Sequence, residues 1–317
     1  MAGTWSRGWA LIIHSINVFK AYPSFLLPIL AVWAAYVPSV LYLRYGYRWG
    51  VHGFRQDSAV VFLFIFGLSF FILMSCAIVL DMIRQIEMGT PSLPKAIEKA
   101  FGKDMFRILP LAIVWAAIWF LLTLIEAIFA KKRDNDDGRL TAQNAAATIA
   151  NYRNFSFSTA FIEALKKGVR MVVFLIMPAI VWEDLSFYDA TKKGLAVLRA
   201  HLGDFGVGYA LTYAAATVVF FPPAVIFELG TGHHGNPPLM HFPDSVWIGT
   251  IIYMGLAWSF CIYLEQMFMA QLYLWHMKWE ESVSHAKISN EALPRFDDVA
   301  CPELLAKTPG LFMPSMS

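Results

Sequence analysis

The chain has 317 residues, of which 58% are hydrophobic and 15% are charged, and its formal net charge is +2. Soluble domains carry about 25% charged residues, so this composition excludes an ordinary soluble protein, and the small net charge argues against a nucleic-acid partner. The three cysteines, Cys76, Cys261 and Cys301, show no paired spacing, so we expect neither a disulfide framework nor a zinc site.

The N-terminal segment Met1–Leu30 is expected to be retained, because polar residues interrupt it and no clean signal-peptide core is present. Within it, Trp9–Lys20 places apolar residues on one side at helical spacing. This pattern predicts a helix that lies along the membrane surface and leads into the first membrane span.

Six segments are predicted to cross a membrane, since a helix needs about 20 mostly apolar residues to do so. The fourth has a short apolar core, Met171–Trp182, and crosses only if Phe161–Leu165 continues the helix. The fifth is expected to be interrupted at Pro222-Pro223. The predicted fold is an all-α, polytopic membrane helix bundle over residues 1–281, followed by an extended cytoplasmic tail over residues 282–317. The spans are residues 24–43, 59–80, 108–130, 161–182, 205–227 and 246–277.

The distribution of lysine and arginine between the loops favours a cytoplasmic N-terminus. With six spans, both termini are then cytoplasmic. The loop after the fifth span, which holds His233, His234 and His241, faces the opposite side of the membrane.

Two further segments, Pro91–Lys103 and Phe187–Arg199, are predicted to be amphipathic helices at the inner membrane surface. Their lysines are candidate contacts for anionic lipid headgroups. Ser92–Phe101 also aligns without gaps on Ser186–Leu195, which suggests a duplication of span, surface helix and span. The candidate headgroup contacts are Lys95, Lys99, Lys192 and Lys193.

Two glutamates lie within predicted spans, and such residues are candidates for function. Glu126 could relay a proton or cation or contact a lipid headgroup, or it could sit near the end of its span and reach water or Lys131. Glu265, with Gln266 and Gln271 nearby, could act in the same way or could hold helices together.

No catalytic motif is present in the sequence, so a non-enzymatic protein without catalytic, cofactor or metal site is favoured over a membrane enzyme. His233, His234, His241 and Asp244 form a metal-like group, but their spacing in a Gly/Pro-rich loop is more typical of a solvated turn.

One stretch, Pro178–Phe205, resembles a pattern found in six-span bacterial membrane proteins of unknown function. These are similar to the membrane domain of glycerophosphodiester phosphodiesterases. The resemblance implies six helices with interfacial helices between them, a bacterial inner (cytoplasmic) membrane, and no activity, since that domain is not catalytic. The matching residues are Pro178, Glu183, Leu185, Ala190, Lys192 and Gly194.

Two functions follow from these patterns. The favoured one is a structural, accessory or anchoring subunit of a membrane complex or homo-oligomer, with the tail docking to a partner. The alternative is transport or handling of lipid or a small hydrophobic solute beside the proline-containing fifth span. The candidate docking residues in the tail are Leu304, Leu305, Leu311 and Phe312.

Overall fold

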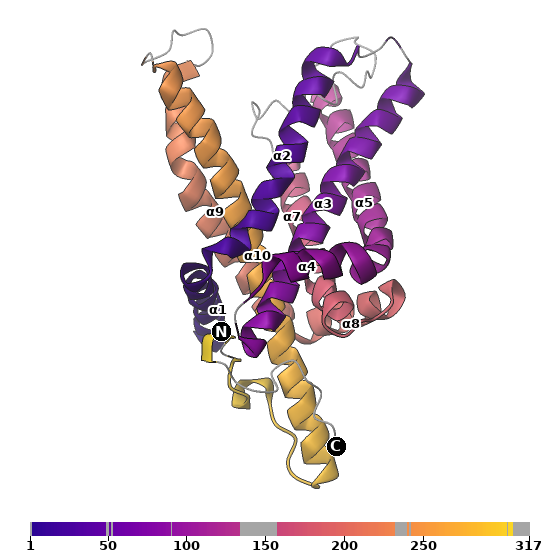
Figure 1. Cartoon of the computed structure of the whole chain (residues 1–317), viewed down its shortest axis with the longest axis vertical. Helices are drawn as coiled ribbons and strands as arrows, with labels where there is room; N and C mark the ends of the chain where they lie inside the picture. Colours follow the sequence, from indigo (N-terminus) through magenta and orange to yellow (C-terminus); the bar gives the residue numbers. More distant parts are fainter. Residues whose placement is uncertain are drawn as a thin grey trace. The chain divides into compact units, whose positions relative to one another are not determined.

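The fold is all-α: a computed structural model shows helices and no strand in the part of the chain that it describes (Figure 1). The described residues are 2–48, 51, 53–89, 91–133, 157–231, 240, 242–302 and 304–306. Among them, five stretches are long and apolar enough to cross a membrane, which identifies a membrane protein. These stretches are Pro23–Leu41, Arg55–Ile86, Leu93–Glu126, Leu202–Gly230 and Asp244–Ile288.

The α-helices are α1 (Ala2–Ala21), α2 (Leu27–Leu41), α3 (Phe54–Met88), α4 (Leu93–Lys99), α5 (Met105–Arg133), α7 (Phe157–Val181), α8 (Phe187–Ala200), α9 (Leu202–Thr231) and α10 (Asp244–Ile288). The short helical turns are η1 (Pro23–Leu26), η2 (Tyr42–Gly46), η3 (Ala100–Asp104), η4 (Phe296–Asp298) and η5 (Leu304–Ala306). Helices α3, α5, α9 and α10 extend beyond the predicted spans at both ends, because polar residues at the ends of a span continue the helix past the apolar core, whereas α2 is shorter than the predicted span at residues 24–43.

The chain divides into two compact units, which we describe separately. Unit 1 comprises Met1–Trp33, Met82–Pro91 and Ala196–Ser317, and unit 2 comprises Ala34–Asp81 and Ser92–Leu195.

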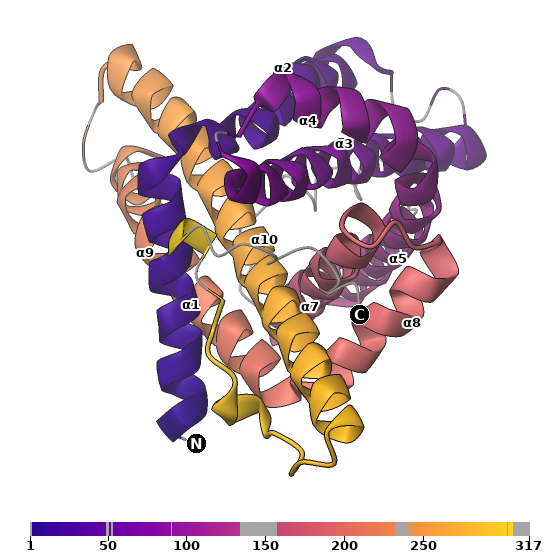
Figure 2. The same cartoon turned by 60° about the horizontal axis from the view of Figure 1, so that its bottom comes forward.

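In unit 1, α1, α9 and α10 pack against one another (Figure 2). Gly208 allows the close approach of α9 and α10, since a Cβ atom at this position would overlap the ring of Phe268. Ser15 joins α1 to α10, because its carbonyl accepts a hydrogen bond from the Tyr263 hydroxyl at 3.1 Å and its hydroxyl accepts one from Gln271 at 2.9 Å. Small residues and buried polar contacts of this kind hold membrane helices together.

The expected interruption at Pro222-Pro223 is wrong, since α9 runs through both prolines. A proline inside a helix has no N–H to donate to the carbonyl four residues before it. For Pro223 that carbonyl belongs to Val219, and the Tyr253 hydroxyl of α10 donates to it at 2.9 Å. A neighbouring helix therefore supplies the hydrogen bond that the proline removes, as membrane helices often do.

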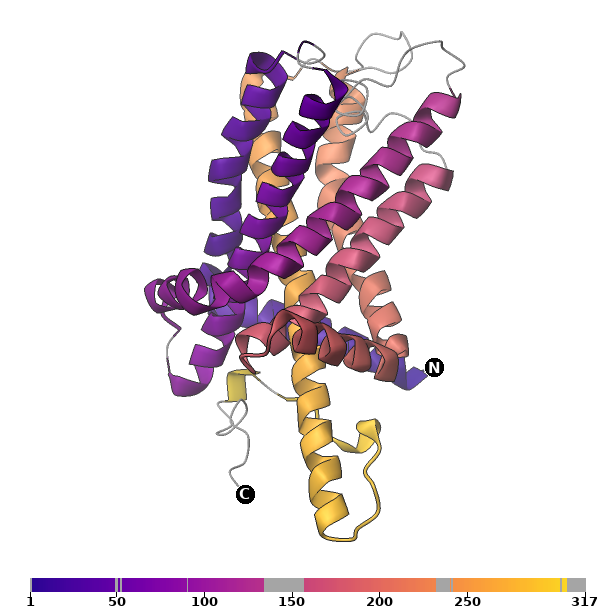
Figure 3. The ribbon, with the colours of Figure 1, turned by 90° about the vertical axis from the view of Figure 1, so that its right-hand side faces the viewer.

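In unit 2, α5 and α7 lie side by side (Figure 3) and α3 packs on α5 through an aromatic-rich core. Trp115 of α5 meets Phe174 of α7 edge-on, with ring centroids 6.2 Å apart. At the end of α7, the buried Trp182 donates its indole N–H to the Leu80 carbonyl of α3 at 3.0 Å. The core residues are Val61, Ile65 and Ala116, surrounded by Phe62, Phe66, Trp119 and Phe120.

Both segments predicted as amphipathic helices contain helices, α4 and α8. Ala96 and Ala190, identical in the aligned segments, are both fully buried. At Gly194 a Cβ atom would lie 2.7 Å from Ile176, so α8 packs tightly on α7 there. On the outer side of α4, Ile97 is 40% exposed, which suits contact with lipid.

Candidate functional site

The first candidate site is a group of charged side chains in unit 2, where α3, the α4–α5 connection and the end of α7 meet. Lys99 of α4 pairs with Asp81 of α3 at 2.6 Å. Asp184, shortly after α7, accepts from Arg107 of α5 at 2.6 Å and contacts Lys103 at 3.0 Å. We call these five residues, and the carboxyl group that lies among them, the carboxylate cluster.

The ion pairs of the carboxylate cluster fix the charge of Asp184. Burial alone would raise the pKa of this carboxyl, but hydrogen bonds from Lys103 and Arg107 outweigh burial and lower it below the ordinary value. Asp184 also has a positive φ of 56°, a backbone conformation that aspartate tolerates better than most residues. The loop after α7 is thus held by two cations of the α4–α5 region.

Asp104 is the sixth member of the carboxylate cluster and differs from the other five in its hydrogen bonding. Its side chain is 0% exposed, and neither of its carboxylate oxygens has a hydrogen-bond partner among the described residues. It lies in the π-helical turn η3 and interacts electrostatically with Lys99, Arg107, Asp81 and Asp184. A buried polar group without a partner is rare and calls for a functional or chemical explanation.

The second candidate site, in unit 1, joins α1, α9 and α10 to residues 289–302, which we call the tail segment. His201, directly before α9, lies with Nε2 2.8 Å from Nδ1 of His276 in α10, so one ring donates to the other. Arg7 of α1 pairs with Asp204 at 3.0 Å and also with Asp297 of the tail segment. We call these five residues, with the aromatic ring that packs on them, the histidine cluster.

Aromatic contacts add to the polar ones at the histidine cluster. The ring of Phe296 packs on His201 with centroids 4.0 Å apart and on Trp275 with centroids 4.5 Å apart. Trp275 donates to the Val299 carbonyl at 2.9 Å, and Trp279 donates to the carbonyl of residue 294 at 3.0 Å. The tail segment is therefore attached to α10 by ring contacts and by hydrogen bonds to its backbone.

His201 is 5% exposed, and burial lowers its pKa from 6.5 to about 4, aided by the neighbouring His276 and the positive charge of Arg7. The imidazole is therefore neutral near pH 7. Its surroundings also include Asp204, with 3.9 Å between the carboxylate and Nδ1, and Glu280, which contacts His276 at 3.2 Å. Acidification adds a positive charge to this buried site.

The two glutamates predicted within spans are placed differently. Glu126 of α5 forms an ion pair of 2.7 Å with Lys166 of α7, and Lys166 also contacts Glu163 at 2.8 Å. This ion pair connects two neighbouring helices, whereas the side chain of Lys131 lies outside the described part of the structure. Glu265 of α10 is buried.

The candidate headgroup lysines divide into two kinds. Lys95 and Lys192 are exposed. Lys99 and Lys193 instead reach carboxylates of unit 2, since Lys99 pairs with Asp81 and Lys193 pairs with Glu183 at 2.6 Å. Helical periodicity placed all four on polar faces, but it carries no information about which carboxylates lie beside those faces.

Of the candidate docking residues, Leu304 is buried and Leu305 is 36% exposed, whereas Leu311 and Phe312 lie outside the described residues. The three loop histidines 233, 234 and 241 also lie outside them. Within the described part of the chain, no three His, Cys, Asp or Glu residues are arranged to hold a metal ion.

Of the members of the two clusters, sequence reasoning named only Lys99 as a candidate site residue, and it named that residue as a lipid-headgroup contact. Asp81, Asp104, His201 and Asp204 stand within or next to long apolar runs, and each is buried. A charged residue at the end of a span is ordinarily solvated, so its position gave no reason to single it out. The signal that could have found them is the position of Asp104 and Asp204, each after a predicted surface helix and just before a span.

Comparisons with protein-family models, curated proteins and solved structures find no match to this chain.

Proposed function

We propose that the chain is a non-enzymatic integral membrane protein that serves as a structural or accessory subunit, and that α10 and the tail segment form the platform for a partner protein. The observation that carries the proposal is the attachment of the tail segment to α10, seen in Figure 3 beside the C-terminal part of that helix.

The length of α10 supports this proposal. Its 45 residues correspond to about 67 Å, whereas the hydrocarbon core of a bilayer is about 30 Å thick. About half of the helix therefore projects beyond the hydrocarbon. The predicted sixth span ends at Met277, so residues 278–288 belong to the projecting part.

Two large apolar side chains of this platform are exposed. Ile288 at the end of α10 is 78% exposed, and Leu293 in the tail segment is 59% exposed. On a surface that is otherwise polar, such side chains are candidates for contact with another protein. The ion pair of Arg7 with Asp297 ties the tail segment to α1 as well.

Photo-crosslinking in native membranes tests the proposal. A photoreactive residue at Ile288 or Leu293 should give one discrete protein adduct, and Ile288→Asp should abolish copurification of that protein without lowering the melting temperature. The matched control is Ile251, which is 64% exposed in the apolar half of α10 and should crosslink to lipid only. Lipid adducts alone from all three positions would contradict the proposal.

The proposal includes six spans, both termini on the cytoplasmic side and a bacterial inner membrane. α7 would be the additional span, beside α5. Among the charged residues of α7, Lys166 forms an ion pair with Glu126 inside the unit, which lowers the cost of placing this residue in a bilayer. The resemblance to six-span bacterial membrane proteins stays part of this proposal.

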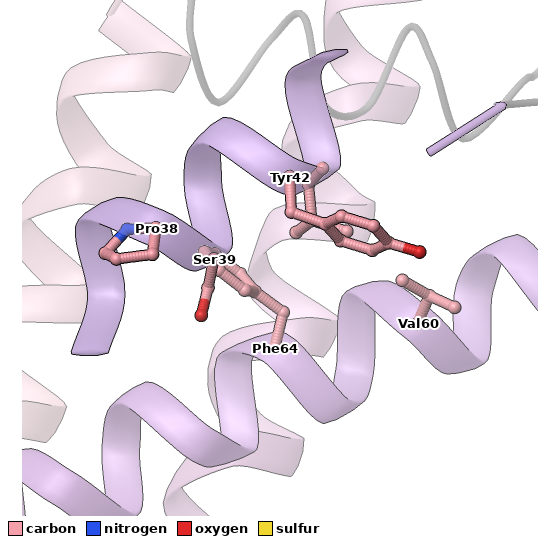
Figure 4. Close-up of a pocket in the computed structure, with 6 residues that line it drawn as sticks. Pro38, Ser39, Tyr42, Val60 and Phe64 are labelled. Atoms are coloured by element: carbon pink, nitrogen blue, oxygen red, sulfur yellow. The ribbon is translucent and has the colours of Figure 1, made fainter. Parts of the chain in front are cut away.

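A second candidate function is handling of lipid or a small hydrophobic solute, and two apolar grooves favour it. One, of about 340 Å³, lies between α2 and α3 and is lined by Pro38, Ser39, Tyr42, Leu43, Val60 and Phe64 (Figure 4). The other, of about 240 Å³, lies between α9 and α10 beside Pro222-Pro223. Both are near the lower limit of small-molecule sites and suit part of an acyl chain.

Flux measurements in reconstituted vesicles distinguish the two functions. If the second function holds, a lipid analogue should cross vesicles that contain the protein faster than empty vesicles. Filling the α9–α10 groove by Gly249→Leu should then lower that rate, since Gly249 lines the groove. Equal rates in protein-containing and empty vesicles would remove this candidate.

A further inference from the structure

The unpartnered carboxyl group of Asp104 carries an inference that is independent of the proposed function. Asp104 is the last residue of the π-helical turn η3, between the surface helix α4 and the long helix α5. Within this turn the neighbouring Lys103 side chain is 57% exposed, whereas Asp104 and Ala100 are buried. The turn therefore directs one carboxyl group into unit 2.

The two cations that interact electrostatically with Asp104 are already paired with other carboxylates. Lys99 contacts Asp81 at 2.6 Å, and Arg107 contacts Asp184 at 2.6 Å. Asp104 interacts with all four charges but forms no hydrogen bond with any described residue. Two anions thus act on Asp104, and the two cations are bound to those anions.

An ionised carboxylate in this position is disfavoured, because burial removes water and no hydrogen bond from a described residue replaces it. A buried carboxyl group avoids this cost by taking up a proton, which neutralises it. The geometry points to Asp104 as a proton-binding site: the folded protein holds it as a neutral carboxylic acid.

Loss of this proton has a definite structural consequence. Ionised Asp104 competes with Asp81 for Lys99 and with Asp184 for Arg107. The first exchange weakens the attachment of α4 to α3, and the second weakens the attachment of α5 to the loop after α7. Protonation of Asp104 is therefore coupled to the way the surface helix α4 is held in unit 2.

Infrared spectroscopy of the full chain in lipid, with carbon-13-labelled aspartate, tests the inference. The label separates aspartate from the buried Glu265. At neutral pH the wild type should show a carbonyl stretch from one protonated aspartate, and Asp104→Asn should lose that band. The matched control is Asp189→Asn, which removes an exposed aspartate of α8 and should leave the band intact.

A pH titration of the wild type alone keeps the inference testable if Asp104→Asn fails to accumulate. The band should persist well above the ordinary range of aspartate, whose pKa in peptides is about 3.9. All aspartate signals titrating within the ordinary range would overturn the inference, as would a neutral-pH spectrum in which Asp104→Asn loses only a carboxylate band.

Discussion

Acidification should destabilise unit 1 through His201. The unfolded chain binds a proton at this histidine near pH 6.5, whereas the folded protein binds it only near pH 4, because burial lowers the pKa. The unfolded state therefore gains the proton first as the pH falls. The stabilising contribution is fully present above pH 6.5 and is lost progressively between 6.5 and about 4.

The loss of unfolding free energy can be calculated from the shift in the pKa of His201. One pKa unit corresponds to about 1.4 kcal/mol, so the difference between 6.5 and about 4 corresponds to about 3 kcal/mol when titration is complete. Because His201 is 5% exposed, solvent screening reduces this little. The protonated imidazole can donate a hydrogen bond to the ring of His276, 2.8 Å away, so about 3 kcal/mol is an upper value.

The assay is unfolding of the full chain in lipid nanodiscs at a series of pH values. The wild type should lose stability over this window faster than His201→Asn, which cannot take up the proton. The quantity to compare is the slope of the free energy of unfolding against pH. Its absolute value is not compared, because His201→Asn also loses the ring contact with Phe296. His285→Asn, an exposed position on α10, is the matched control and should keep the wild-type slope. Equal slopes in the wild type and in His201→Asn would refute the reasoning.

Three further predictions concern helix packing and are measured by unfolding in lipid. Glu126→Gln should lower the free energy of unfolding by about 2–3 kcal/mol, because it leaves the largely buried Lys166 with only one carboxylate. The matched variant Glu163→Gln removes the other, exposed carboxylate and should lower it by under about 1 kcal/mol. Tyr253→Phe should cost about 1 kcal/mol, because it removes the donor to the carbonyl freed by the proline pair. Gly208→Ala should separate α9 from α10 and lower the melting temperature, whereas Gly206→Ala, with open space around it, should not.

The long helices were predictable because hydrophobic length is a local property. The spans predicted at residues 59–80 and 108–130 fall inside α3 and α5, and the prediction required only the composition of each window. The continuity of α9 through Pro222-Pro223 was not predictable in this way. There the carbonyl freed by Pro223 accepts a hydrogen bond from Tyr253, a residue distant in sequence that no local pattern identifies.

The two clusters were unpredictable for a related reason. Whether a charged residue beside a span is solvated or buried depends on which neighbours the fold brings to it. Asp104 and Lys103 are adjacent in sequence, yet one is buried and the other is 57% exposed, and both lie in a π-helical turn, whose winding differs from that of an α-helix. A regular helical period cannot anticipate such a turn.

The aligned surface helices show what a weak sequence repeat can indicate once contacts are known. Lys99 and Lys193 occupy the same position in the two aligned segments, and each pairs with a carboxylate at 2.6 Å. Asp81 lies in the last turns of α3 and Glu183 lies just after α7, so neither carboxylate is part of the aligned segments. The shared lysine therefore attaches each of the two helices, α4 and α8, to the end of the long helix before it, and this is a common structural role for the two aligned segments.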